Sequence, residues 1–374
     1  MGKMFKWYWA FAILFIPLIH LDNGQDSRIY KDLFFIFYGL LSILIFGWRK
    51  NIITSLFGIY FIFHAVTNIS VLSSQSAPFQ VASLMVGLCL IAQLAHNWDN
   101  STSKALANAF SIAAILQAIY IIFQKIGYEP MLWVYSIRNL RGYGDVAGSL
   151  CNSMATGAYL GPISIFLLRP KWVYAFPIVL ISLVFLNSSM GYLSIVAASI
   201  YLLCEKVLKW DKLCMLFLSV FSVYAFIYLF IFNNDLFYSS RRYDAWIEII
   251  NNIGFSLNGK GLGYMGDELW KHIKSIEKLK HAHNEFIQAY VSFGAIGVMM
   301  ILATIFSLLK NHSKEPYFSA CLVGYLASSF GSFTVFISSS SIGIIICLGA
   351  LLHYFFYNNA LCVNLIKPKQ EISV

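Results

Sequence analysis

Long apolar runs alternate with short polar segments along almost the whole chain. A helix needs about 20 consecutive apolar residues to cross the hydrocarbon core of a bilayer. The pattern therefore predicts an all-α polytopic membrane protein with about 12 transmembrane helices, or ten to 12 because two pairs are separated by short turns. The predicted spans are roughly 5–20, 33–48, 52–72, 79–97, 104–124, 146–168, 172–187, 189–204, 213–232, 284–309, 316–337 and 339–357.

Two longer polar segments, 125–145 and 233–283, interrupt this pattern. The second is the largest and divides the chain into three parts. These are a transmembrane bundle over 1–232 with about nine spans, a large external loop over 233–283, and C-terminal transmembrane helices with a tail over 284–374.

Apolar residues recur at helical spacing in two stretches of the large loop. The first predicted amphipathic helix starts at Arg242 and ends near Gly254, after Asn251 and Asn252; its apolar face comprises Trp246, Ile249, Ile250 and Ile253. A second helix is expected to begin with Asp267 as its N-cap. Its apolar stripe comprises Leu269, Ile273, Ile276 and Leu279, and its other face carries Lys271, Lys274 and Lys278. These lysines are either solvated charges on an interfacial helix or a basic lid over an anionic lipid head group.

Composition and charge agree with a membrane location. Hydrophobic residues make up 59% of the chain and charged residues 11%, against about 25% charged in soluble domains. If the N-terminus is cytoplasmic and the spans alternate, the inside segments hold 14 basic and five acidic residues, and the outside segments hold 12 of each. This positive-inside bias predicts cytoplasmic termini and an external large loop. A nucleic-acid partner is not indicated, because no aromatic–basic patch lies outside the apolar segments.

The sequence does not indicate a cofactor or a metal. The seven cysteines are scattered and form no CxxC pair, so a zinc site is not expected. A GxGxxG pattern at Gly261, Gly263 and Gly266 lies outside any strand–helix–strand unit, which a dinucleotide site requires. The glycines are better explained by tight turns; the alternative is that their amides approach a phosphate.

The junction between the large loop and the following apolar segment holds the sequence Lys280-His281-Ala282-His283-Asn284-Glu285. A histidine beside a helix N-terminus is kept neutral by the helix dipole, so His283 is a candidate general base. The alternative is a polar cap at a membrane interface. The pair His281 and His283 lacks neighbouring Cys or Asp ligands, which argues against a metal site. The other histidines are single and unpatterned, at positions 20, 64, 96, 272, 312 and 353.

His283-Asn284, followed after nine residues by Gly294-Ala295-Ile296-Gly297, resembles the signature of the O-antigen ligase and O-antigen polymerase superfamily. Arg242 and Trp246 resemble the arginine and aromatic residue at the start of that family's large periplasmic loop. Arg141-Gly142 with Asn152 and Ala155 resembles its upstream Gly…Asn-x-x-Ala segment. The family often has Ser-Arg-Gly where this chain has Ser189-Met190-Gly191, so Met190 replaces an arginine.

This resemblance implies a metal-independent glycosyltransferase of the bacterial inner membrane that acts on the periplasmic side. The donor would be a glycan on undecaprenyl diphosphate. The acceptor would be lipid A-core for a ligase, which is slightly favoured, or another lipid-linked repeat for a polymerase of O-antigen or capsule. The absence of a DxD sequence agrees with a donor other than a metal-bound nucleotide sugar.

The residues suggest a role for each candidate in such a transfer. His283 would act as the base or orient the acceptor. Arg242 would be the main phosphate clamp and Arg141 the second cation, since arginine binds phosphate with paired hydrogen bonds. Asn284 would orient His283. Other candidate substrate-binding residues are Arg138, Arg141, Arg241, Lys274, Lys278, His281 and Asn284. A transporter or lipid-linked glycan flippase is the alternative from another class; the near absence of charges within the predicted spans argues against it.

Overall fold

A computed structural model describes residues 2–18, 27–67, 77–129, 146, 148–150, 152–205, 242–262, 264–267, 269–274, 282–310, 314–331 and 338–358. Within these ranges the chain is helical and contains no strand. The helices are α1 (Gly2–Phe15), α2 (Ser27–Phe46), α3 (Ile52–Thr67), α5 (Ala77–Asn97), α6 (Asn100–Lys125), α8 (Ser153–Ile163), α9 (Phe176–Leu186), α10 (Ser189–Leu203), α13 (Arg242–Ile253), α14 (Tyr264–Asp267), α15 (Glu285–Leu309), α16 (Pro316–Ser328) and α17 (Ser338–Asn358). Short 3-10 helices are η1 (Ile16–Leu18), η2 (Ser164–Leu168), η3 (Val173–Ala175) and η6 (Leu269–His272).

Helices occupy eleven of the twelve predicted apolar segments, and the twelfth, 213–232, lies outside the described residues. Among the described residues, three helical stretches are long and apolar enough to cross a membrane: Gln80–Asn97 in α5, the whole of α6, and the whole of α15. Most of the other described helices contain shorter apolar stretches. The all-helical class is thus confirmed, whereas the number of membrane crossings stays a prediction.

The main core lies between helices that pack through small residues as well as through aromatic ones. α10 packs against both α8 and α16, α1 against α6, and α5 against α2 and α17. A Cβ atom on Gly161 of α8 would lie 1.9 Å from Ser194 Oγ of α10, so the two helices meet at a spacing that only glycine permits. In the same core the rings of Phe110 in α6 and Phe166 in η2 stack with their centroids 4.9 Å apart.

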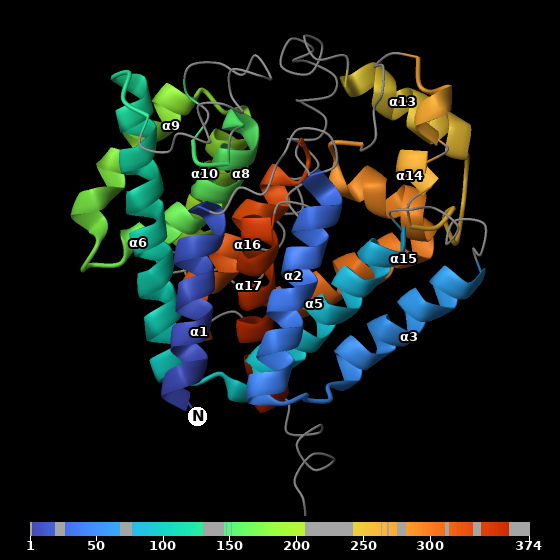
Figure 1. Cartoon of the computed structure of the whole chain (residues 1–374), viewed down its shortest axis with the longest axis horizontal. Coiled ribbons are helices and arrows are strands. Elements are labelled where there is room, and N and C mark those ends of the chain that lie inside the picture. The colour runs from blue at the N-terminus through green and yellow to red at the C-terminus, as the bar shows by residue number, and fades with distance from the viewer. Residues whose placement is uncertain are drawn as a thin grey trace, which may run out of the picture.

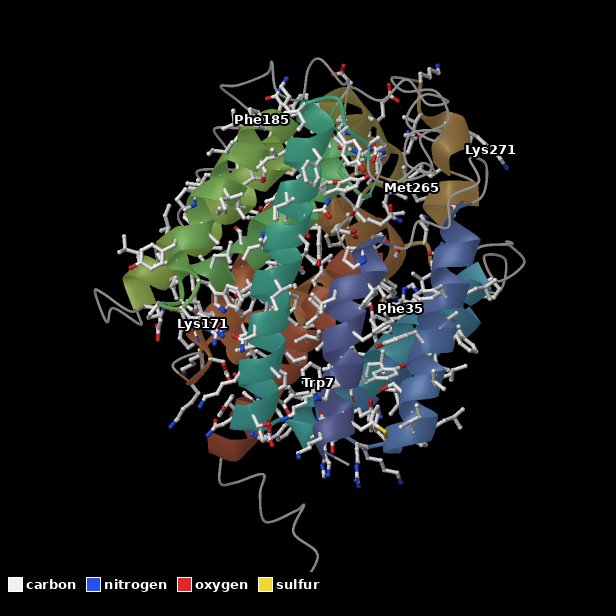
Figure 2. The ribbon with its side chains drawn as sticks, turned by 60° about the vertical axis from the view of Figure 1, so that its left-hand side comes forward. Trp7, Phe35, Lys171, Phe185, Met265 and Lys271 are labelled. Atoms are coloured by element: carbon white, nitrogen blue, oxygen red, sulfur yellow. The ribbon has the colours of Figure 1, made fainter. Side chains whose placement is uncertain are left out.

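The loop helices lie at the end of the molecule opposite the N-terminus. α13 and α14 lie at the upper right of Figure 1, and the N-terminus lies at the bottom. Figure 2 shows Met265 and Lys271 at the same end as Phe185, whereas Trp7 lies at the other end. The helices of the large loop therefore lie at one end of the molecule only, as a protein with one large loop on one side of a membrane would require.

A second cluster of buried apolar residues attaches the large loop to the bundle. Ala158 of α8 and Met190 of α10 pack in this cluster, which we call the outer cluster, with loop and α15 residues. Its other buried members are Ala245, Trp246, Ile249, Ile253, Met265, Leu269, Ile273, Ala282 and Val291. Apolar burial at this point stabilises the loop on the bundle.

The first predicted loop helix is confirmed as α13, and Gly254 ends it in the left-handed conformation (φ 62°). The predicted apolar face is wrong at Ile250, whose side chain is 47% exposed. The buried stripe of α13 instead runs from Ala245 and Trp246 to Ile249 and Ile253.

The predicted start of the second loop helix is also wrong. Asp267 ends the short helix α14, and the next described turn, η6, is a 3-10 helix. The amide of Lys274 donates to Glu248 Oε2 of α13 (2.7 Å), whereas in an α-helix it would donate to the carbonyl four residues earlier. Leu269 and Ile273 are nevertheless buried, as the apolar stripe predicted.

Candidate functional site

His283 and Asn284 form a tight turn immediately before α15. His283 adopts the left-handed conformation (φ 51°), which non-glycine residues seldom adopt and which is often found at functional sites. Asn284 follows in extended conformation and is the N-cap of α15: its Oδ1 accepts hydrogen bonds from the amides of Phe286 (3.0 Å) and Ile287 (3.1 Å). The sequence prediction that His283 lies just before the first turn of this helix is confirmed.

The side-chain amide of Asn284 reaches the end of α16 rather than the imidazole. Its Nδ2 donates to the carbonyl of Phe330 (3.0 Å), and the amide of Glu285 donates to the carbonyl of Ser329 (2.9 Å). Asn284 therefore fixes the start of α15 against the end of α16. The expected role of Asn284 in orienting His283 stays a prediction.

Arg242, at the start of α13, lies over the same helix end. Its Nη1 donates to the carbonyl of Gly331 (3.0 Å) and lies 3.0 Å from Met154 Sδ at the start of α8. Both contacts use one terminal nitrogen, and the rest of the guanidinium makes no hydrogen bond to residues that the structure describes. A guanidinium has five N–H groups, so this cation retains donors for an anion.

The imidazole of His283 and the guanidinium of Arg242 interact electrostatically. Burial and the nearby positive charge of Arg242 lower the pKa of His283 from 6.5 to about 4. Burial also lowers the pKa of Arg242, but an arginine stays protonated at neutral pH. The site therefore pairs a neutral imidazole with a permanent cation.

The backbone before His283 is held by residues from α13 and α15. The indole Nε1 of Trp246 donates to the carbonyl of Ala282, and the amide of Ala282 donates to Gln288 Oε1 (3.2 Å). Trp246 is 1% exposed, so its indole N–H needs such a buried acceptor. The Arg242-x-x-x-Trp246 pair thus places its cation near the imidazole of His283 and its indole on the carbonyl of the preceding residue.

The glycine-rich segment after α13 docks against α15. The amides of Lys260 and Gly261 donate to the carbonyls of Val291 (2.7 Å) and Ser292 (3.0 Å). Gly259 and Gly261 have positive φ, so the expectation of tight turns is confirmed for these two glycines. The alternative in which the amides of these glycines approach a phosphate is wrong for Gly261, because the carbonyl of Ser292 in α15 already accepts from its amide.

An apolar cavity of about 360 Å³ starts beside the site. Glu285, Gln288 and Ser329 line it next to the start of α15, and Leu308 and Leu352 line it far along α15 and α17. Its walls come from α2, α3, α5, α15, α16 and α17. A cavity with this lining suits an apolar chain whose polar head stays near His283.

The structure brings Arg242, His283 and Asn284 together. Lys274 is exposed in the segment after η6. The other predicted site residues lie outside the described part of the chain: Arg138, Arg141, Arg241, Lys278 and His281.

The two remaining residues of the resemblance have clear local roles. Asn152 is the N-cap of α8, and its Oδ1 accepts from the amide of Ala155 (3.0 Å). The Asn-x-x-Ala spacing is thus explained by helix capping. Met190 is 2% exposed within the outer cluster, near Trp246 and Met154, so an apolar contact occupies the position where the family often has an arginine.

Sequence reasoning missed two residues of α3. The hydroxyl of Tyr60 donates to the carbonyl of Phe293 in α15. The imidazole of His64 hydrogen-bonds to the carbonyl of Asn258 in the glycine-rich segment. A histidine within an otherwise apolar span was the available signal, because polar side chains are rare at such depth and are usually paired.

Comparison of the chain with models of known protein families found no match. Comparison with curated proteins also found none. The family resemblance therefore depends on the residues quoted above and on their arrangement.

Proposed function

We propose that the protein transfers a glycan from a polyprenyl diphosphate to a sugar hydroxyl on the outer side of a membrane. The observation that carries this proposal is the pairing of His283 and Arg242 at a helix start beside an apolar cavity. A diphosphate leaving group needs a cation, an attacking hydroxyl needs a base, and a polyprenyl chain needs an apolar slot. Each requirement has a matching feature within one small region.

The reaction proceeds as one displacement with balanced charges. The acceptor hydroxyl loses its proton to the imidazole of His283 as its oxygen attacks the anomeric carbon of the donor. The bond from that carbon to the diphosphate oxygen breaks, and its electron pair leaves with the polyprenyl diphosphate. Arg242 offsets the negative charge on the leaving group.

Donor binding tunes the base. A pKa of about 4 leaves His283 neutral but weakly basic. A diphosphate on Arg242 would offset the cation that helps to lower this pKa, so the pKa rises when the donor binds. The imidazole then becomes a stronger base only with substrate in place.

The test is glycan transfer in cells that lack the native gene, followed on a lipopolysaccharide gel. Wild type, His283→Gln, Arg242→Gln and Lys271→Gln are supplied at matched membrane levels. Lys271 is an exposed cation of the same loop, so Lys271→Gln controls for loss of charge. We expect Lys271→Gln to restore the ladder. Losing the base costs about 100-fold or more in rate, and losing the cation costs about 100- to 1,000-fold.

The phenotype of the deletion distinguishes the two acceptors. Cores with no attached glycan indicate a ligase, which transfers to lipid A-core, and cores with a single repeat indicate a polymerase. A full ladder from both His283→Gln and Arg242→Gln would contradict the proposed chemistry and favour the transporter alternative.

The cavity is tested separately with two tryptophans on α15. Ala289 lines the cavity, whereas Ala303 is exposed on the outside of the same helix. Ala289→Trp fills the slot and is expected to raise the KM for a lipid-linked donor, while Ala303→Trp leaves it unchanged. Equal KM values for the two variants would remove the cavity from the proposal.

A further inference from the structure

α15 is broken at Gly294, where φ is 67° and ψ is −168°. In an unbroken helix the amides of Ala295 and Ile296 would donate to the carbonyls of Val291 and Ser292. Instead these amides donate to the carbonyls of Ser256 (3.0 Å) and Leu257 (3.1 Å). Four hydrogen bonds to the loop thus replace two helical ones, since Val291 and Ser292 also accept from Lys260 and Gly261.

We call residues 256–261 the wedge, because they fill the break in α15. Helix breaks within an apolar region require that every freed backbone group finds a partner. The wedge supplies both acceptors and donors for this purpose. It also makes the break depend on the exact position of a loop segment.

Glycines at the contact let the two backbones approach closely. A Cβ atom on Gly259 would lie 2.6 Å from the amide nitrogen of Gly294, and one on Gly294 would lie 2.3 Å from the amide nitrogen of Gly259. Both residues also have positive φ. The wedge and the break therefore fit only when both positions are glycine.

Two residues of α3 clamp this contact from the other side. Tyr60 Oη donates to the carbonyl of Phe293 (3.0 Å), and His64 Nε2 hydrogen-bonds to the carbonyl of Asn258. Since a carbonyl only accepts, Nε2 of His64 carries the proton. One residue joins α3 to the broken helix and the other joins α3 to the wedge.

The packing around these hydrogen bonds is close. His64 is 3% exposed, and the ring of Phe293 lies 5.6 Å from its ring and 4.9 Å from that of Phe61. A Cβ atom on Gly297 would lie 3.1 Å from Tyr60 Oη. The second glycine of the Gly294-Ala295-Ile296-Gly297 sequence thus provides room for the clamp.

The wedge is linked to both helices that begin at the candidate site. Its start follows Gly254, which ends α13, the helix that begins with Arg242. Its hydrogen bonds hold the part of α15 that begins directly after His283 and Asn284. Tyr290 adds a further link, because its hydroxyl donates to the carbonyl of Gly254 and accepts from the amide of Ser256, both at 2.9 Å.

We propose that Tyr60 and His64 are positioning residues, which hold the wedge in the break of α15 and thereby fix Arg242 relative to His283. The positioning of the wedge stands on the hydrogen bonds alone, whereas its effect on glycan transfer rests on the proposed function. α3 is otherwise an exposed helix, with Ile52, Ile59 and Phe63 each more than 60% exposed. The buried side chain of His64 and the half-buried side chain of Tyr60 are instead directed at this contact.

The first measurement is hydrogen–deuterium exchange of the full chain in lipid nanodiscs, read on peptides that cover 255–262 and 290–297. The variants are Tyr60→Phe, His64→Leu and His64→Gln, with Ile59→Val as the control on the exposed face of α3. Loss of one hydrogen bond is expected to speed exchange about fivefold or more in Tyr60→Phe and His64→Leu. His64→Gln keeps an N–H near the position of Nε2, so it is expected to exchange like wild type and Ile59→Val.

The second measurement separates positioning from general structural support. In purified glycan transfer, Tyr60→Phe and His64→Leu are expected to lower kcat more than they raise the donor KM, and His64→Gln is expected to restore kcat. Exchange in Tyr60→Phe and His64→Leu that matches Ile59→Val would overturn the inference, whatever the activity. Faster exchange together with no transfer by wild type would leave the wedge contact standing and refute the proposed function.

Discussion

His283 and Arg242 share one electrostatic environment although 41 positions separate them in the chain. The pKa of His283 is lowered to about 4, first by burial and then by the charge of Arg242. Helix-dipole arguments from the sequence predicted the direction of this shift. Burial and a second side chain are the causes in the folded protein, and neither is visible in the local sequence.

This electrostatic coupling predicts a pH profile. Neutral His283 accepts carbethoxylation by diethyl pyrocarbonate, so its reactivity should be constant from about pH 8 down to about pH 5 and fall only near pH 4. Arg242→Gln removes the neighbouring charge, so the midpoint should move up toward 6.5. The modification is followed by mass spectrometry of the peptide that contains His283. A wild-type midpoint at 6.5, or no shift in Arg242→Gln, would contradict this assignment.

The lowered pKa of His283 also makes the stability of the folded protein depend on pH. The folded pKa lies below the unfolded value of 6.5, so the unfolded state binds more protons as pH falls from 6.5 toward 4. The contribution of neutral His283 to stability is complete above pH 6.5 and is lost over this window. His283→Gln should therefore weaken the loss of stability with falling pH across the same window.

Among the helices, α15 combines a capped start with an internal break. Its cap at Asn284 was predictable from the His-Asn junction, and its length from the apolar run. The break at Gly294 was not predictable, because an isolated glycine in a helical pattern is usually tolerated without a break. What decides it is the wedge, which comes from a separate segment and satisfies the freed backbone groups.

The break predicts different outcomes for two glycine substitutions. Gly294→Ala places a Cβ 2.3 Å from two backbone atoms at φ 67° and ψ −168°, a combination essentially restricted to glycine. It should destabilise the protein by about 1–3 kcal/mol from this backbone conformation alone, and by more from the clash. Gly87→Ala on α5 places a Cβ 3.7 Å from its nearest neighbour in a regular helix. It should be neutral or stabilising by up to about 1 kcal/mol.

Thermal unfolding in detergent, followed by circular dichroism, compares these variants. We expect Gly294→Ala to lower Tm and Gly87→Ala to leave it equal or higher. An unchanged Tm in Gly294→Ala would show that the wedge contact does not contribute to the stability of the fold.

The two ends of the whole molecule carry different exposed lysines. Lys271 lies at the end with α13 and α14, and Lys171 lies away from that end (Figure 2). The positive-inside bias predicts that Lys171 is cytoplasmic and that Lys271 is external. This orientation also places His283 and the polar end of the cavity on the outer side.

Cysteine labelling tests the orientation. In a variant without native cysteines, Lys271→Cys should react with a membrane-impermeant maleimide on intact spheroplasts. Lys171→Cys should react only after the membrane is permeabilised, because both residues are exposed and the positive-inside bias predicts that they lie on opposite sides. The reverse labelling pattern would invert the topology and place the proposed chemistry on the cytoplasmic side.

The sequence alone determined the helical class, the positions of most helices, the amphipathic helix α13 and the junction at His283, because these depend on apolar periodicity, caps and local charge. Tertiary structure decided that Asp267 ends a helix, that α15 breaks at Gly294 and that Arg242 lowers the pKa of His283. It also brought Tyr60 to the broken helix and His64 to the wedge, each from more than 190 positions away in the chain. These features depend on which backbone and side-chain groups meet after packing, and no local pattern of residues carries that information.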